Sequence, residues 1–345
     1  MKNIYGETLK DLEEYFLSLN EKKFKAIQVY DWLYKKRVSS FDDFSNVKKN
    51  VIDNLKNDYS ISKLVISKVE RDVEVNKYLF ELDDKRYVES VLMRHDYGLS
   101  ICISSQVGCN MGCKFCESGR LKKVRNLEAY EMILQILQVE EDIKERITHV
   151  VIMGIGEPFD NYDNIVKFIE IINNPKGIEL GSRHITVSTC GIVPKIEEFS
   201  NLPFQVNLAI SLHAPNNELR NKLMPINKVY PLERLIPAIE KYISKTNRRV
   251  TFEYIMLDKI NDTEECANEL CNLLKGLNCY INLIPYNETN NFEYKRSKKK
   301  TILKFYDIIK NRRLNVTIRK EFGSNISAAC GQLRSKKEDV WNHFI

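Results

Sequence analysis

The stretch Cys109-Asn-Met-Gly-Cys113-Lys-Phe-Cys116 places three cysteines at C-x3-C-x2-C spacing in one short segment. A closed zinc site would need a fourth cysteine or histidine at a matching spacing. The five histidines form no such pair, since they are scattered over the chain at His95, His149, His184, His213 and His343. Three thiolates can instead bind three irons of a [4Fe–4S] cluster and leave the fourth iron open to a small molecule. The motif therefore predicts a catalytic cluster with Cys109, Cys113 and Cys116 as its ligands.

This spacing resembles the signature of the radical S-adenosylmethionine (SAM) superfamily. In that superfamily the open iron binds the amino and carboxylate groups of SAM, which is then cleaved reductively. The resemblance implies one [4Fe–4S] cluster and SAM as cofactors. Gly108 and Gly112 open the backbone around the cysteines, which argues against three ordinary buried thiols.

The length and composition indicate which class of protein the chain belongs to. A chain of 345 residues can bury a large core, as one large domain with an extension. Residues 1–19 are charged throughout, and no apolar run approaches the roughly 20 residues that span a bilayer. Nine cysteines in this length do not suggest a secreted disulfide scaffold. We therefore expect a soluble, cytoplasmic protein with no membrane partner.

Basic residues recur in short runs, and the formal net charge is +6. A single run is usually a solvated helix face. Five together favour a polyanionic partner, with binding that depends on salt. The runs are Lys35–Arg37, Arg120–Arg125, Arg248–Arg249, Lys295–Lys300 and Arg312–Arg313.

From about residue 100 onward, strand-like runs alternate with amphipathic helical ones. Six strands are expected, at Leu99–Ser104, Ile147–Met153, His184–Thr189, Gln205–Ser211, Val250–Leu257 and Cys279–Ile284, followed by a helix at Lys300–Asn311 and a strand at Asn315–Arg319. Pro237 lies inside one helical run and should kink that helix or shift its start. Six βα units with nearly continuous apolar strands predict an α/β fold, an incomplete (β/α)6 barrel with its chemistry at the carboxyl ends of the strands.

The first 95 residues have a different pattern. Helices are expected at Leu9–Leu19, Ala26–Lys36 and Val47–Asn57, and strand-like runs at Leu64–Glu70 and Lys77–Leu82. This predicts an accessory helical/β domain over residues 1–95, the barrel over 96–320 and a tail over 321–345. Trp32, Leu33 and Tyr34 beside the basic run 35–37 suit either a face that stacks bases or the core of a helical domain.

Glycine and polar residues follow several expected strands and should meet at one mouth. In Met153-Gly-Ile-Gly-Glu-Pro158, Gly154 and Gly156 allow close backbone approach to SAM, and Glu157 can accept from its amino group. No third glycine stands at the spacing of a dinucleotide-binding fold. Later strand ends add polar groups suited to a ribose or an amino acid, each of which is equally a candidate turn or cap residue: Ser188, Ser211, His213 and Asn287.

Motifs over nearly the whole chain resemble the RlmN/Cfr family of radical-SAM RNA methyltransferases. They are Ala26–Tyr34, Cys102–Cys109, Met153–Pro158, Val187–Gly191, Ser211–Pro215, Asn282–Asn287 and Ala329–Leu333. The most specific combination is a cysteine seven positions before the cluster motif together with Ala-Cys-Gly-Gln-Leu in the tail. Cys190 and the segment 117–119 depart from the usual family pattern.

The resemblance implies methyl transfer to an aromatic carbon of adenosine in RNA. C2 is favoured, in 23S rRNA and, for some members, tRNA; C8 methylation of 23S rRNA, which gives antibiotic resistance, is the alternative. Two SAM molecules are used per turnover. One methylates Cys330, and the other supplies a radical that takes a hydrogen from the new methyl group.

The resemblance also implies roles for further residues. Cys102 would remove the ring proton and release the product by forming a disulfide with Cys330, and Glu89 would be a proton acceptor. The SAM contacts would be Gly156, Glu157, Ser188, Ser211, Leu212, His213 and Asn287. The partners would be RNA, with the accessory domain as an RNA-binding unit, and a reductant such as flavodoxin or ferredoxin. By pattern alone, Cys102 is equally a buried strand cysteine, Cys330 a free thiol in a flexible loop, and Glu89 an exposed strand glutamate.

Two other functions fit parts of the pattern. One is a radical SAM enzyme acting on a small molecule or peptide, with incidental basic runs. The other is a metal-bearing RNA-binding module without catalysis. Neither needs Cys330, whereas methyl transfer through the tail does.

Overall fold

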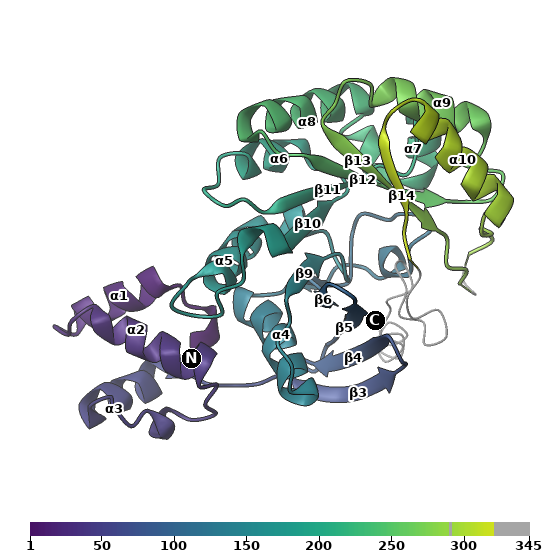
Figure 1. The fold of residues 1–345 in the computed structure, drawn as a ribbon. Coiled ribbons are helices and arrows are strands. Elements are labelled where there is room, and N and C mark those ends of the chain that lie inside the picture. The colour runs from purple at the N-terminus through teal and green to yellow at the C-terminus, as the bar shows by residue number, and fades with distance from the viewer. Residues whose placement is uncertain (290–291, 321–345) are drawn as a thin grey trace.

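A single mixed sheet forms the centre of the computed structural model, which describes residues 1–289 and 292–320 (Figure 1). Within these ranges the sheet has ten strands in the order β14-β13-β12-β11-β10-β9-β6-β5-β4-β3. The parallel part consists of β6 (Gly98–Cys102), β9 (His149–Ile152), β10 (Ile185–Thr189), β11 (Asn207–Ser211), β12 (Val250–Met256), β13 (Cys279–Pro285) and β14 (Asn315–Ile318). All six expected strands of the barrel are present, as is the strand that follows them.

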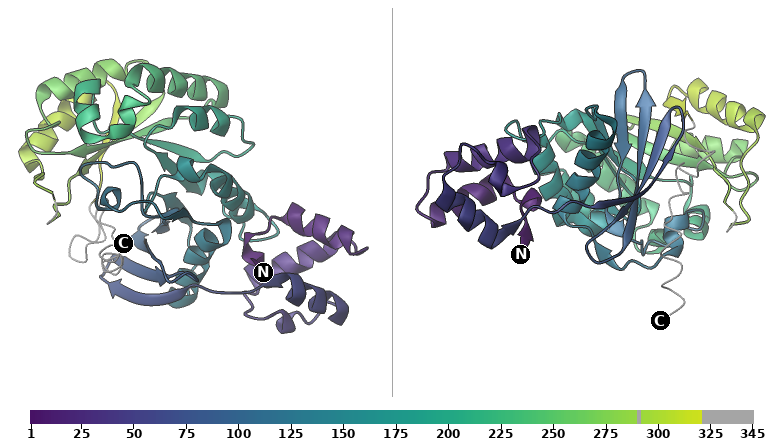
Figure 2. Two further views of the ribbon diagram at one scale, coloured as in Figure 1. Left: turned by 180° about the vertical axis from the view of Figure 1, so that it is seen from behind. Right: turned by 90° about the horizontal axis from the view of Figure 1, so that it is seen from below.

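Helices connect the parallel strands and cover one face of the sheet (Figures 1 and 2). They are α4 (Ala129–Ile143), α5 (Tyr162–Asn173), α6 (Val193–Phe199), α7 (Asn217–Leu223), α8 (Leu232–Thr246), α9 (Glu264–Leu273) and α10 (Lys299–Asn311). Helix α8 contains Pro237 and still begins at Leu232, so the proline does not shift its start. The curved, open sheet with outer helices confirms the predicted incomplete barrel.

The two faces of the sheet differ in polarity. On β12, Phe252 and Tyr254 are fully buried on the face that the helices cover. The opposite, concave face carries a row of polar side chains that are in register across four strands: Ser211, Glu253, Asn282 and Thr317. Since the side chains of a strand alternate between its faces, the same strands supply an apolar core and a polar lumen.

Three antiparallel strands extend the sheet beyond β6. They are β3 (Val65–Arg71), β4 (Val75–Glu81) and β5 (Tyr87–His95), and β5 is joined to β6 by the tight turn at residues 96–97. The sequence analysis named no strand over 87–95, although one interpretation of Glu89 placed it on a strand. The sheet therefore runs across the domain boundary expected near residue 95, and the separate helical unit ends near residue 60.

The N-terminal helices form a compact group beside α4 and α5 (Figure 1). The group contains α1 (Leu9–Ser18), α2 (Phe24–Tyr30), the π-helical turn η2 (Asp31–Lys35) and α3 (Lys49–Asp58). Trp32 is buried, stacks on Phe44 with 5.6 Å between ring centroids, and donates to Asn46 Oδ1 at 2.6 Å. Of the two interpretations of this aromatic segment, the structure supports a helical core. In the described ranges, no helix is long and apolar enough to span a bilayer.

A buried glutamine on α4 holds the end of β6. Gln135 is fully buried, and its Oε1 accepts hydrogen bonds from Ser104 N at 2.9 Å and Ser90 Oγ at 2.7 Å. Its Nε2 donates to Ser104 O at 3.2 Å. Since Ser104 leads into the cysteine segment, this one side chain links the helix layer to the start of that loop.

We predict that Gln135→Leu lowers the free energy of unfolding by about 2–4 kcal/mol, because it leaves the buried amide and carbonyl of Ser104 without partners. Urea denaturation measures the change. The matched control is Gln205→Leu at an exposed position, with an expected effect below about 0.5 kcal/mol. Equal effects of the two substitutions would contradict the prediction.

Candidate functional site

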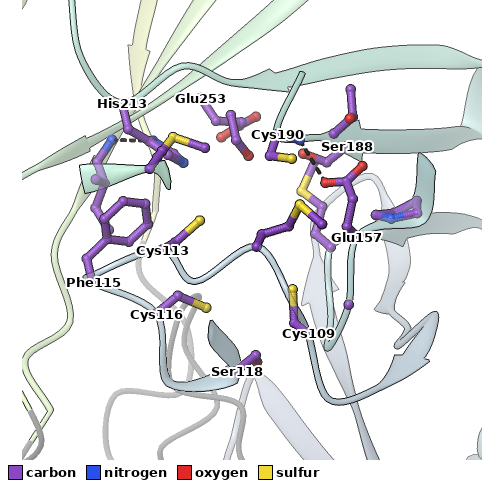
Figure 3. Close-up of a pocket in the computed structure, with 18 of the residues that line it drawn as sticks. Cys109, Cys113, Phe115, Cys116, Ser118, Glu157, Ser188, Cys190, His213 and Glu253 are labelled. Carbon is purple, nitrogen blue, oxygen red and sulfur yellow. Dashed lines mark hydrogen bonds between the residues drawn. The ribbon is translucent and has the colours of Figure 1, made fainter. Parts of the chain in front are cut away.

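A pocket lies at the carboxyl ends of the parallel strands (Figure 3). One wall is the segment from Cys109 to Ser118, and most of the rest comes from residues at or near the ends of β9 to β13, with Met224 after α7 and Arg319 after β14. The polar and sulfur-bearing lining residues are Cys109, Met111, Cys113, Cys116, Ser118, Met153, Glu157, Ser188, Thr189, Cys190, Ser211, His213, Met224, Glu253 and Arg319. The expected meeting of the strand ends at one mouth is thus observed.

The three cysteines of the motif point into this pocket (Figure 3). Gly108 has φ 74°, and a Cβ there would stand 2.1 Å from the carbonyl oxygen of Lys122. The turn that starts the loop therefore requires glycine. Farther along, Lys114 N donates to Leu223 O at 2.9 Å, which seats the loop on the end of α7.

The donor set suits an iron–sulfur cluster better than a single ion. Burial raises the pKa of the Cys109 thiol to about 12, and that of Cys113 well above its usual value, so these thiols need a bound metal to become thiolates. Among the described residues, no three His, Cys, Asp or Glu side chains are placed to hold one metal ion. A [4Fe–4S] cluster requires thiols that surround a shared cavity, because each thiolate binds a different iron. Cys109, Cys113 and Cys116 meet that requirement.

Glu157 fixes the loop between β9 and α5. Its Oε1 accepts from Phe159 N at 3.0 Å, and its Oε2 accepts from Cys190 N at 2.8 Å. Burial raises the pKa of this carboxyl, while these hydrogen bonds act in the opposite direction. Gly156 has φ 112°, and a Cβ there would stand 2.7 Å from the Cβ of Gln106. Gly156 and Glu157 both line the pocket. In addition, Glu157 binds two backbone amides and Gly156 allows the close approach of Gln106, which the sequence did not predict.

His213 is held as a neutral ring. Its Nδ1 accepts from Ile255 N at 3.1 Å, and its ring meets Phe115 edge-on at 4.9 Å. Ser188 and Ser211 line the same pocket. The fully buried Leu212 is not among its lining residues. Asn287 is half-buried and lies outside the lining as well.

The sequence analysis missed Glu253 on β12. This carboxyl is buried, lines the pocket and accepts from Asn282 Nδ2 at 2.8 Å. Burial raises its pKa, and the charge of Arg319 lowers it. A signal was available, because Glu253 is the one charged residue in the run 250–257.

Cys102 and Glu89 lie on the sheet beside the pocket. Cys102 is buried, stands opposite Val91 of β5 and packs in a cluster that includes Met153, which also lines the pocket. Glu89 is buried as well, with one carboxylate oxygen 3.0 Å from Lys77 Nζ. The alternative of an exposed strand glutamate is therefore wrong. Cys330 lies outside the described residues.

The last described residues connect the β14 edge of the sheet with the turn between β3 and β4 through one ion pair. Arg319 follows β14 and lines the pocket. Lys320 Nζ lies 2.7 Å from Glu74, at the turn between β3 and β4. The chain thus leaves β14 in the direction of the strands that carry Glu89 and Cys102.

Comparisons with known proteins identify the relatives of this arrangement. Residues 103–270 match the Radical SAM superfamily, and residues 2–61 match the ribosomal RNA large subunit methyltransferase N-terminal domain. A protein of Enterococcus faecalis, "Probable dual-specificity RNA methyltransferase RlmN", is 54% identical, with 99% of each chain covered. A protein of the same description from Spiroplasma citri is 50% identical, again over 99% of both chains.

The chain belongs to the RlmN family of radical SAM methyltransferases. A crystal structure of a radical SAM methyltransferase from Sphaerobacter thermophilus has the same fold, with a TM-score of 0.91 and 38% identity over 97% of this chain and 99% of that one. Membership of the family implies a [4Fe–4S] cluster and SAM, in agreement with the donor set of the pocket.

The neutral state of His213 makes stability depend on pH. Burial and the charge of Arg220 lower the pKa of His213 to about 3, against about 6.5 in an unfolded chain. Between these values the unfolded chain binds a proton that the folded protein does not. The contribution of His213 is therefore fully present above about pH 6.5 and is lost as the pH falls, by about 1.4 kcal/mol per unit.

We predict that His213→Asn weakens this pH dependence. Asparagine tolerates the left-handed backbone at this position, where φ is 58°, and does not titrate. Between pH 7 and 5.5, the variant should lose about 1 kcal/mol less unfolding free energy than the wild type, as measured by urea denaturation. Identical pH profiles for the two proteins would show that His213 is not buried in its neutral form.

Proposed function

We propose that this protein methylates an aromatic carbon of adenosine in RNA, with C2 favoured, by carrying the methyl group on Cys330. The observation that supports this most is that the cysteine-lined pocket and Cys102 lie on the same sheet. The cysteine-lined pocket lies at the carboxyl ends of the strands, and Cys102 belongs to the hydrophobic cluster against which Met153, a pocket residue, is packed. A radical SAM enzyme without a resolving thiol would not need Cys102 there.

The three motif cysteines would hold the cluster, while Glu157, Ser188, Ser211 and His213 would surround SAM together with the backbone near Gly156 and Leu212. Asn287 would add a contact from the loop after β13. When bound, the cluster supplies the electron that cleaves SAM to a hydrogen-abstracting radical. Two SAM molecules would be consumed, since one provides the methyl group and the other the radical. A flavodoxin or ferredoxin would supply the electrons.

Cys330 would take the methyl group from the first SAM as a thiolate nucleophile. Addition of the methylene radical to adenine would leave one unpaired electron, which would pass to an acceptor such as the oxidised cluster, while Cys102 would accept the ring proton. Attack of the Cys102 sulfur on the Cys330 sulfur would then form a disulfide and break the bond between Cys330 and the new carbon, which would take up a proton to become the methyl group. Cellular thiols would reduce the disulfide. This redox cycle suits a cytoplasmic location.

The described end of the chain supports the meeting of these two cysteines. Lys320 already contacts Glu74 at the turn before β4. Ten further positions (330 − 320) separate it from Cys330, and an extended chain covers up to about 3.3–3.6 Å per residue. A segment of that length would allow Cys330 to return toward the concave face.

Glu89 is suited to accept a proton near Cys102. It lies on β5, two residues from Val91, the partner of Cys102 across the strands, and so shares its face of the sheet. The ion pair with Lys77 favours the carboxylate form that a base needs. We assign it the role of proton acceptor within this proposal.

RNA is the proposed substrate class because relatives over the full chain carry that description and because basic runs recur. We propose 23S rRNA and tRNA as targets, and the helical unit at the N-terminus as an RNA-binding element. C8 methylation of 23S rRNA is the second candidate. A small-molecule enzyme or a non-catalytic module would leave Cys330 without a role.

We predict that Cys330→Ala abolishes RNA methylation, since no methyl carrier remains, while reductive SAM cleavage by the reconstituted enzyme continues. Cys102→Ala should instead accumulate protein covalently linked to RNA, because the adduct forms but is not resolved. Denaturing gels and mass spectrometry distinguish the two results.

The matched control is Cys271→Ala, which removes a buried thiol on α9 in the helix layer. It should retain methylation and form no adduct. Full methylation by the Cys330→Ala protein would contradict the proposed mechanism. Failure of the wild type to cleave SAM in the presence of reductant would favour the non-catalytic module.

The modified carbon can be read from nucleoside mass spectrometry. We expect rRNA and tRNA from cells with the gene to contain 2-methyladenosine that is missing without it. A gain of 8-methyladenosine would establish the second candidate instead.

A further inference from the structure

A fully buried arginine lies behind the pocket wall. Arg220 on α7 has no exposed surface, and each of its hydrogen bonds goes to a neutral oxygen. Its Nη2 donates to Cys190 O at 2.7 Å and to Ser211 O at 3.2 Å, its Nε to Leu212 O at 3.2 Å, and its Nη1 to Asn227 Oδ1 at 2.8 Å. One side chain thus binds the carboxyl ends of two neighbouring strands.

The charge of Arg220 has no carboxylate partner among the described residues. Burial lowers its pKa to about 10, which still leaves it protonated near neutral pH. A buried guanidinium without a carboxylate is costly, because neutral carbonyls only partly replace its hydration. Such a charge is stabilised by an anion, and the described residues do not provide one.

The cysteine loop is the neighbour that can supply this anion. The loop is seated on the helix that carries Arg220, through the bond from Lys114 N to Leu223 O. Met224, directly after this helix, packs with Phe115 in the same cluster as Cys113. Gly191 lies close enough that a Cβ there would stand 3.5 Å from Arg220 Nη2. The guanidinium therefore lies between the ends of β10 and β11 and the helix α7, on which the cysteine loop is seated.

We propose that Arg220 is the counter-charge of the iron–sulfur centre, and that it makes the cluster easier to reduce while it positions the ends of β10 and β11. A [4Fe–4S] cluster with three thiolates carries net negative charge, and reduction adds one more electron. A cation held in the low-dielectric interior stabilises the reduced form more than the oxidised form. Arg220 does not line the pocket, so it is a positioning residue and not a contact of SAM.

The experiment compares two substitutions in the full-length, reconstituted protein. Arg220→Gln removes the charge and keeps part of the hydrogen bonding, whereas Arg220→Lys keeps the charge and loses the planar fork. The midpoint potential of the cluster is measured by a redox titration followed by electron paramagnetic resonance, without SAM or RNA. We expect a more negative potential for Arg220→Gln and a potential close to the wild type for Arg220→Lys.

The control is Lys222→Gln, which removes a charge two positions away on the same helix. Lys222 is exposed and paired with Glu218, so its loss should leave the potential unchanged. Equal potentials in the wild type and both Arg220 variants would overturn the proposal. So would equal shifts in both variants, since these would show that hydrogen bonds alone matter.

Iron content decides the case in which Arg220→Gln does not load a full cluster. Iron retained by Arg220→Lys and lost by Arg220→Gln supports a requirement for charge. Equal depletion of both variants overturns it. The inference rests on the cluster but not on the RNA substrate. A wild type that reduces its cluster but methylates no RNA would refute the proposed function and leave this test intact.

Discussion

The pairing of β6 with both of its neighbours is the constraint on which the site depends. β6 joins β9 in parallel on one side and β5 antiparallel on the other. Its last residue is Cys102, and the chain then runs from Ser104 into the cysteine loop. The hydrogen bonds of one short strand therefore set both the position of the cysteine-lined pocket and that of the thiol proposed to resolve the product.

Burial of charged and titratable groups shapes the pocket around this strand. Glu157 is held by two backbone amides, Glu253 by an amide side chain, and His213 accepts a backbone hydrogen bond as a neutral ring. Arg220 supplies a positive charge behind them. These groups cost free energy where they are, and they leave little freedom for the strand ends to move. A pocket of this kind is preorganised for an anionic centre and a polar cofactor.

The extension by β3, β4 and β5 separates this architecture from a barrel of βα units alone. It adds the ion pair between Lys77 and Glu89 on the face that also carries Cys102. The helical unit at the N-terminus packs against α4, where Arg37 forms an ion pair with Glu140 at 2.5 Å. Trp32 and Tyr34 are used in its own core, whereas Phe24 is exposed, so RNA binding by this unit would rely on its exposed basic side chains and on Phe24.

The sequence by itself determined the cysteine spacing, the order of strands and helices in the barrel and the polar residues at the strand ends. These features are encoded by near neighbours in the chain, so that periodicity and spacing reveal them. The tertiary structure alone decided that β5 continues the barrel sheet, that Trp32 is a core residue and that both oxygens of Glu157 accept from backbone amides. It also decided that Arg220 has only neutral hydrogen-bond partners among the described residues. The physical reason is that burial and hydrogen-bond partners come from segments far apart in the sequence, and only packing brings them together.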